Sequence, residues 1–237
     1  MLELKNVSYS VTEGGKEKPI LKNISFTANE RFIAITGPNG SGKSTLAKIV
    51  AGILKPTGGT ILLDGEDVTG LGVTERARAG ISFAFQQPVR FKGITVKDLI
   101  SIAAGKDISI GAACAYLSEV GLCARDYIGR EVNASLSGGE LKRIEIATVL
   151  ARGTKVSVFD EPEAGIDLWS FQSLIRVFEN LHKKAGGSIL IISHQERILE
   201  IADKIVVVKN GGIERVGSAK EILPALVNRS ACGALNA

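Results

Sequence analysis

A glycine-rich segment followed by a lysine and a serine carries the clearest chemistry in the sequence. Its members are Gly37, Pro38, Asn39, Gly40, Ser41, Gly42, Lys43, Ser44 and Thr45. An apolar stretch precedes them and a helical pattern follows, so backbone N–H groups and the helix dipole are set to bind phosphate oxygens. Lys43 is expected to reach the β- and γ-phosphates, and the Ser44 hydroxyl to ligate Mg²⁺. The segment therefore predicts a phosphate loop (Walker A) for a nucleoside triphosphate.

Two adjacent carboxylates end a second apolar segment. Asp160 and Glu161 follow residues 156–159, which are typical of a buried strand. We expect this strand to lie beside the strand before the phosphate loop, with both acids at the carboxyl edge of the sheet, where ligands bind. Successive side chains of a strand point to opposite faces, so the two acids can differ in role. The pattern assigns Asp160 to the Mg²⁺ shell and Glu161 to orienting or deprotonating the attacking water.

A third segment, residues 136–140, stands directly before another helical pattern. Ser137 and Glu140 have the spacing of a capping box, which by itself predicts only a helix start. Gly138 and Gly139 are costly in a cap, and they expose backbone N–H groups at the positive end of a helix. The segment therefore predicts a second anion site.

Taken together, these segments resemble the ABC ATPase family. Residues 136–140 are similar to its signature motif, and the order of the other motifs matches from Leu2 to Leu226. The resemblance implies that the nucleotide is ATP, that the chain hydrolyses it, and that two copies dimerise head to tail. ATP would then lie between the phosphate loop of one subunit and Ser137, Gly138 and Gly139 of the other.

The resemblance also assigns roles to single residues. It implies that Gln86 senses Mg²⁺ and the γ-phosphate, that His194 contacts the γ-phosphate beside the catalytic Glu161, and that Tyr9 stacks on adenine. Glu140 and Asp167 join the nucleotide-binding set. The implied metal ligands are Ser44, Gln86 and Asp160.

Shorter segments resemble the SufC-type ATPases of iron–sulfur cluster assembly. They are residues 85–96, 137–143 and 194–199, with residues 74–78 and 165–171 similar to the short SufC-like form. This resemblance implies the ATP-hydrolysing subunit of a SufBC-type complex, whose ATP-driven dimerisation remodels a soluble SufB-like scaffold. The alternative is the nucleotide-binding subunit of an ABC membrane transporter, with the groove from Gln86 to Val96 receiving a membrane helix.

Lys142 lies one turn into the helix that follows the signature. The spacing suggests the hypothesis that Lys142 pairs with Glu161 in the resting monomer and holds that carboxylate away from water. Replacement of Lys142 by alanine would then raise the basal rate of hydrolysis.

Strand patterns alternate with helical patterns along the chain, which indicates an α/β fold with a mainly parallel sheet. We expect an N-terminal antiparallel β subdomain and an inserted helical subdomain within one domain spanning residues 1–237. The ATP-binding core lobe would comprise residues 1–87 and 153–226, and the helical subdomain residues 88–152. A tail at residues 227–237 is expected to fray.

Composition limits the classes of protein. The chain has 237 residues, of which 45% are apolar, enough for a substantial core, and its net charge is +4. Dense Lys/Arg runs are missing, so we expect no nucleic-acid partner. Apolar runs fall far short of the about 20 residues of a membrane span, and the first residues do not form a signal peptide, so we expect a cytoplasmic protein. The cysteines, Cys114, Cys123 and Cys232, lack metal-ligand spacing.

Overall fold

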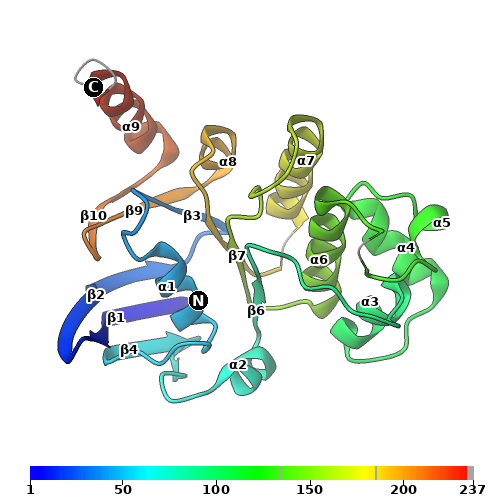
Figure 1. Ribbon diagram of the computed structural model, residues 1–237, viewed down its shortest axis with the longest axis horizontal. Helices are drawn as coiled ribbons and strands as arrows, with labels where there is room; N and C mark the ends of the chain where they lie inside the picture. Colours follow the sequence, from blue (N-terminus) through cyan, green and yellow to red (C-terminus); the bar gives the residue numbers. More distant parts are fainter. Residues whose placement is uncertain (134, 185, 234–237) are drawn as a thin grey trace.

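The computed structural model describes residues 1–133, 135–184 and 186–233 (Figure 1). Within these residues the strands form two sheets, one antiparallel and one mainly parallel. None of the helices in this part of the chain is long and apolar enough to cross a membrane.

The antiparallel sheet is built almost entirely from the start of the chain. Its strand order is β2-β1-β4-β5, and the strands are β1 (Leu2–Glu13), β2 (Lys16–Ala28), β4 (Gly58–Leu63) and β5 (Glu66–Asp67). Leu2 and Leu4 alternate with more exposed residues, and both are buried. This period of two gives the sheet one apolar face, which packs toward the second sheet.

The mainly parallel sheet has the strand order β10-β9-β3-β8-β7-β6. Its strands are β3 (Phe32–Thr36), β6 (Ile81–Ala84), β7 (Val156–Asp160), β8 (Ser188–Ile192), β9 (Lys204–Lys209) and β10 (Gly212–Gly217). Only β10 runs antiparallel to its neighbour β9. All residues of β3 are buried, as expected for a strand covered on both faces.

Helices cover the parallel sheet and form a lobe at one side of it (Figure 1). They are α1 (Lys43–Val50), α2 (Val73–Ala79), α3 (Val96–Ala104), α4 (Ile110–Glu119), α5 (Ala124–Tyr127), α6 (Gly138–Arg152), α7 (Leu168–Lys184), α8 (Glu196–Ile201) and α9 (Ala219–Gly233). The segment from α3 to α6 is inserted between β6 and β7 and gathers beyond the β6 edge. The expected α/β architecture, with an antiparallel β part and an inserted helical part, is confirmed.

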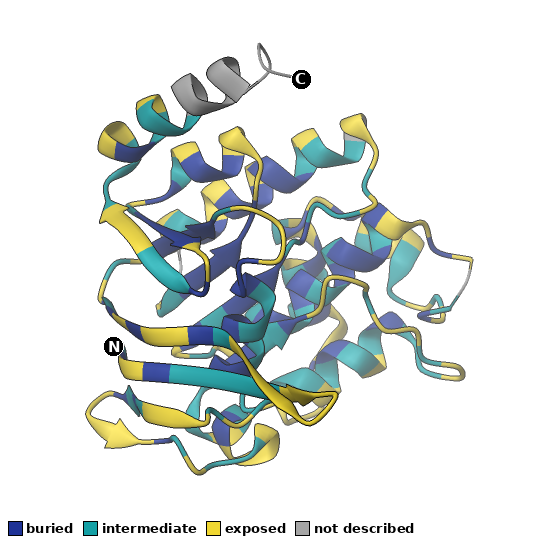
Figure 2. Cartoon of the chain, turned by 60° about the vertical axis from the view of Figure 1, so that its left-hand side comes forward, coloured by how far each residue is buried: buried dark blue, intermediate teal, exposed yellow. Residues whose placement is uncertain are grey.

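Two apolar clusters hold these layers together. One lies under the helices and contains Phe32, Phe159 and Phe178, whose rings meet edge to face. The other lies between the two sheets and includes residues of α1, and its members Leu46 and Ile35 are fully buried. Figure 2 shows the buried strands running through the middle of the molecule. Both faces of the parallel sheet are thus packed, which fixes the strand ends that carry polar residues.

A buried arginine secures the far end of α1. The side chain of Arg76 is 1% exposed, and its guanidinium donates hydrogen bonds to the carbonyls of Ile49, Val50 and Thr69. The last carbonyls of a helix have no partner within the helix, so this cation both satisfies them and complements the helix dipole. Arg76 therefore fixes the helix whose first turn follows the phosphate loop.

The last helix of the described residues is α9, which begins at Ala219, continues through Pro224 and reaches Gly233. It therefore includes part of the tail expected at residues 227–237, and the fraying of that tail stays a prediction. Residues 234–237 lie outside the described residues.

Candidate nucleotide-binding site

The phosphate loop connects β3 to α1, and its glycines have backbone conformations that other residues rarely adopt. Gly37 has φ 141°, and a Cβ atom there would lie 1.9 Å from the carbonyl oxygen of Val208. Gly42 has φ 100°, and its Cβ would lie 2.5 Å from the Leu21 side chain. Glycine is therefore required at both positions, because the loop passes close to β9 and to β2.

Lys43 points back into the loop. Its side chain is buried, and Nζ donates hydrogen bonds to the carbonyls of Gly37 at 2.9 Å and Pro38 at 3.0 Å. Burial lowers the pKa of Lys43, while Glu161 and Asp160 act to raise it. Next to it, the buried Ser41 hydroxyl has no hydrogen-bond partner within the described residues. A cation and an unpaired hydroxyl inside a glycine loop fit a triphosphate chain.

Ser44 on α1 is hydrogen-bonded to Asp160 at the end of β7. Ser44 Oγ donates to Asp160 Oδ1 at 2.9 Å. The expectation that β7 lies beside β3 is wrong, because β8 lies between them. The two residues still meet because α1 packs across the sheet over both β8 and β7. Burial raises the pKa of Asp160, and the Ser44 hydrogen bond opposes that rise. A hydroxyl and a carboxylate are the hard oxygen ligands that Mg²⁺ takes beside phosphates, so the pair fits that ion.

Glu161 lies between Gln86 and His194. Gln86 Nε2 donates to Glu161 Oε2 at 2.9 Å, and His194 Nε2 is 3.5 Å from Glu161 Oε1. The backbone of Glu161 has φ 44°, a left-handed conformation that costs about 1–2 kcal/mol outside glycine. Burial and the nearby Lys43 lower the pKa of His194, although Glu161 opposes them. The structure therefore brings Gln86 and His194 together around the Glu161 carboxylate, and the lowered pKa of His194 favours its neutral form at neutral pH.

The hypothesis that Lys142 pairs with Glu161 is wrong. Lys142 is 1% exposed, and its Nζ donates to the carbonyl of Phe85 and to Glu145 Oε2, the latter at 3.2 Å. Lys142 and Glu145 are three positions apart on α6 and therefore lie on the same face of the helix. The cation is already held by these two groups, and Glu161 is held by Gln86 and His194.

The sequence reasoning missed Glu163, a third carboxylate near the site. Its Oε1 accepts hydrogen bonds from Ser193 Oγ at 2.5 Å and from the backbone N–H of His194 at 3.4 Å. Its Oε2 is buried without a hydrogen-bond partner within the described residues. Burial raises the pKa of Glu163, and repulsion by Glu161 adds to that rise. The available signal was a third acid directly after the strand that ends in Asp160.

The raised pKa of Glu163 predicts a pH-dependent stability. Unfolded Glu163 ionises near its ordinary value of 4.5, whereas folded Glu163 keeps its proton to higher pH. Above that value the unfolded state binds fewer protons, so this residue lowers the free energy of unfolding as pH rises. Glu163→Gln cannot ionise and keeps an acceptor for Ser193. The melting temperature of Glu163→Gln, relative to the wild type, should therefore rise as pH increases above 4.5.

A matched control has the opposite sign. Hydrogen bonds from the backbone N–H and hydroxyl of Ser218 lower the pKa of Glu221, so its contribution to stability is present at higher pH. Glu221→Gln should therefore lose melting temperature relative to the wild type as pH rises toward 4.5, and above 4.5 the difference should stay constant. A pH-independent difference for Glu163→Gln would show that its carboxyl group ionises normally.

The signature segment begins α6 as a complete capping box. Ser137 N–H donates to Glu140 Oε2 at 2.6 Å, and the Glu140 N–H donates to Ser137 Oγ at 3.3 Å. A Cβ atom on Gly139 would lie 3.0 Å from Ser170, and one on Gly138 would lie 3.5 Å from the carbonyl of Gly165. The structure thus places the signature against residues 165–170 of its own chain, where Asp167 Oδ1 accepts from Ser170 N–H at 3.0 Å.

Tyr9 lies on β1, one strand away from the loop. It is paired in register with Leu21, whose side chain lies against Gly42. The ring of Tyr9 packs, half-buried, against the cluster between the sheets. Contact between Tyr9 and adenine stays a prediction.

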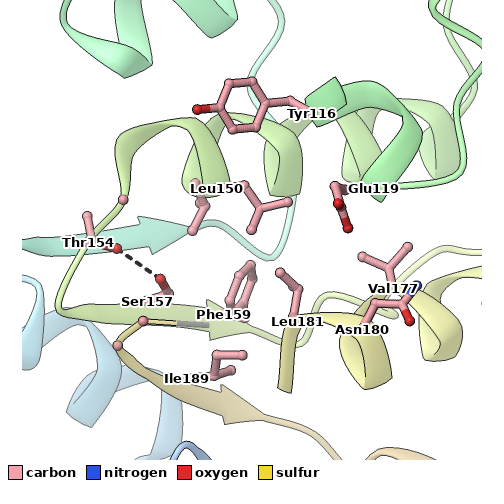
Figure 3. Close-up of a pocket in the computed structure, with 14 residues that line it drawn as sticks. Tyr116, Glu119, Leu150, Thr154, Ser157, Phe159, Val177, Asn180, Leu181 and Ile189 are labelled. Atoms are coloured by element: carbon pink, nitrogen blue, oxygen red, sulfur yellow. Dashed lines mark hydrogen bonds between the residues drawn. The ribbon is translucent and has the colours of Figure 1, made fainter. Parts of the chain in front are cut away.

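A separate cavity of about 280 Å³ lies at the opposite end of β7 (Figure 3). Thr154 and Ser157 line it where β7 begins, while Asp160 stands where β7 ends. The remaining wall is mainly apolar and comes from α4, α6 and α7, including Leu150 and Leu181. Its position separates this cavity from the phosphate loop.

The fold and the site together define a P-loop nucleotide-hydrolysing domain. A glycine loop with a buried lysine follows the central strand of a parallel sheet, and a Ser–Asp pair and a second, hydrogen-bonded carboxylate stand at the same edge. A helix that begins with two glycines adds a second anion-binding end on the inserted lobe.

Comparisons with known proteins agree. The chain belongs to the ABC transporter family, whose pattern matches residues 21–164. An uncharacterized ABC transporter ATP-binding protein of Methanocaldococcus jannaschii is 40% identical over 92% of this chain and 90% of its own length. The energy-coupling factor transporter ATP-binding protein EcfA1 of Ureaplasma parvum is 35% identical over 93% of this chain and 75% of its own length.

The solved structures extend this agreement to three dimensions. A dimeric ATP-binding cassette bound to ADP and phosphate superposes with a TM-score of 0.82 at 26% identity, covering 92% of this chain and 99% of that one. The expected ABC ATPase fold is therefore confirmed, and the chain is an ATPase that binds and hydrolyses ATP.

The same comparisons correct the narrower resemblance. The relatives are named as ATP-binding subunits of transporters, so the SufC-type assignment, the SufBC-type function and the soluble SufB-like partner are wrong. The segments behind that assignment partly serve the fold of this chain itself. Phe85, Ser137 and Lys142 make hydrogen bonds within the chain, so their similarity does not identify a scaffold.

Proposed function

We propose that this chain is the ATP-hydrolysing subunit of an ABC membrane transporter and acts at the cytoplasmic face of the membrane. The observation that carries the proposal is that transporter subunits match this chain over nearly its whole length. They include energy-coupling factor and sulfate/thiosulfate import proteins. Lacking a helix that could cross a membrane within the described residues, it would depend on a partner for the membrane-spanning part.

The phosphate loop would bind ATP and position its phosphates. Lys43 would exchange its hydrogen bonds to the Gly37 and Pro38 carbonyls for bonds to phosphate oxygens, while Ser41 supplies a hydroxyl from within the loop. Ser44, Asp160 and Gln86 would hold Mg²⁺, which supplies neutralisation of the charge that develops on the phosphates.

Glu161 would accept the proton of the attacking water. Its two carboxylate oxygens are fixed by Gln86 and His194, which orients the base before it acts. Glu163 holds the Ser193 hydroxyl and the His194 backbone, so it would set the position of His194. Glu161 also keeps a left-handed backbone, and such strained residues occur preferentially at functional sites.

We further propose head-to-tail dimers with ATP between the phosphate loop of one copy and the signature of the other. The Ser137 cap, the two glycines and the positive end of α6 form an anion-binding end on the inserted lobe, residues 88–152. The core lobe, residues 1–87 and 153–226, would supply the other half of the site. The similarity to dimeric cassettes supports this arrangement.

The segment after β6 has the character of a partner-binding surface. Phe85 is 42% exposed and Val89 is 48% exposed, and the segment runs from the end of β6 past α6 toward α3 (Figure 1). Apolar side chains that are exposed together are typical of protein contacts. A helix of the membrane partner would contact this segment and so reach Gln86.

Site-directed crosslinking tests the transporter proposal. A photo-reactive residue at Val89 should crosslink to a polytopic membrane protein in detergent-solubilised native membranes. Val216 on β10 is the matched control, because it is a valine with a similar exposure of 45%. Capture of a soluble protein at Val89, or equal capture of the membrane protein at both positions, would contradict the proposal.

A further inference from the structure

The peptide group of Phe85 is held from both sides by α6. The Phe85 N–H donates to Glu145 Oε1 at 2.9 Å, and the Phe85 carbonyl accepts from Lys142 Nζ. Lys142 and Glu145 also pair with each other at 3.2 Å, with side chains 2% and 15% exposed. We call this set of three residues the α6 clamp.

The other end of the same loop is also tied to the inserted lobe. Phe91 N–H donates to the Val132 carbonyl at 2.8 Å, and Val132 N–H donates to the Ile94 carbonyl at 3.0 Å. Both ends of the segment from Phe85 to Ile94 are therefore fixed to the lobe that carries the signature. Next to the clamp, Gln86 bonds to Glu161, which directly follows β7.

Burial of the charged pair Lys142–Glu145 has a desolvation cost that an apolar pair would not have. A buried ion pair is often no more stable than an apolar pair of similar volume, whereas it does fix one geometry. Burial raises the pKa of Glu145, and Lys142 opposes that rise. Leucine or methionine would therefore fill the same space. The charged pair, unlike them, can hydrogen-bond both the N–H and the carbonyl of Phe85.

We propose that Lys142 and Glu145 are positioning residues for Gln86, which make the segment after β6 move with α6 so that a shift of the signature helix makes or breaks the Gln86–Glu161 contact. This inference rests on the proposed role of Gln86 and Glu161 in hydrolysis. The segment that the transporter partner would contact starts at the clamp. Binding of the partner could therefore change the contact between Gln86 and the Glu161 carboxylate.

A double-mutant cycle with Gln86 tests the clamp. The variant Lys142→Met/Glu145→Leu replaces the ion pair by apolar groups of similar size, and we expect it to stay folded at the assay temperature, which its melting curve checks. If the clamp acts through Gln86, its loss of turnover should match that of Gln86→Ala to within about twofold, and combining all three changes should cost nothing further. A merely structural pair would instead give losses that multiply.

Arg143→Met is the matched control on the same helix. Arg143 donates to the carbonyls of Gly121 and Gly139 rather than to Phe85, so Gln86→Ala should keep its full effect in that background. Wild-type turnover of the double variant, or a full additional loss on adding Gln86→Ala, would overturn the clamp. Wild-type turnover of Gln86→Ala alone would instead overturn the proposed role of Gln86.

Discussion

Replacing Glu161 by glutamine should lower ATP turnover by about 10²–10⁴-fold, the range for loss of a general base, while ATP binding stays near the wild-type level. The amide keeps the size of the carboxylate and still accepts the hydrogen bond from Gln86, so the site should keep its shape. What it cannot do is accept a proton from water. Turnover is measured by phosphate release and affinity by titration with a fluorescent ATP analogue.

The control for this variant is Glu66→Gln on β5. Glu66 is an exposed carboxylate on the N-terminal sheet, outside the proposed site, and its replacement should leave turnover unchanged. Turnover of Glu161→Gln within a few-fold of the wild type would remove Glu161 from the role of base. Loss of ATP binding in Glu161→Gln would show that the carboxylate holds the nucleotide or the shape of the site.

Gly37→Ala should abolish ATP binding and lower the free energy of unfolding by about 2–6 kcal/mol, from overpacking together with backbone strain. The new methyl group would lie 1.9 Å from the Val208 carbonyl oxygen, in a strand that is buried and paired on both sides. Neither β3 nor β9 can move away without breaking the sheet. Urea unfolding measures the stability, and nucleotide titration measures the binding.

Gly40→Ala separates the clash from the strain. Gly40 lies in the same loop with φ 76°, but a Cβ atom there would meet nothing within 4 Å. It should therefore cost about 1–2 kcal/mol, the cost of a left-handed conformation alone. Equal losses for Gly37→Ala and Gly40→Ala would mean that contact with β9 does not decide the fold of the loop.

Much of the fold follows from sequence because periodicity and motif order are local properties. The strand expected at residues 156–159 is β7 (Val156–Asp160), and the helix expected after the signature is α6 (Gly138–Arg152). The neighbour of β7 was not predictable in this way, since two buried apolar strands are equivalent until their crossover helices are placed. The α9 helix was missed because its Pro224 and small residues lack a clear helical period.

The site shows the same division. Motif spacing predicted that Ser44 and Asp160 serve one centre, and they are in contact. Spacing gave the wrong partner for Lys142, because on a helix the residue three positions later competes for the same cation, and Glu145 Oε2 lies 3.2 Å from Lys142 Nζ. Glu163 was not predicted, because its raised pKa results from burial, and the burial of one side chain cannot be read from a single sequence.

The position of β3 also bears on how the protein is made. Its Ile33 pairs with Leu190 of β8 and Lys204 of β9, so the strand before the phosphate loop receives its neighbours only after most of the chain has left the ribosome. At the usual pace of translation that delay is roughly 10 to 30 s. The antiparallel sheet needs only residues 2–67 and can form first. A nascent chain therefore spends much of its synthesis with an apolar central strand unpaired, in the period when chaperones are most needed.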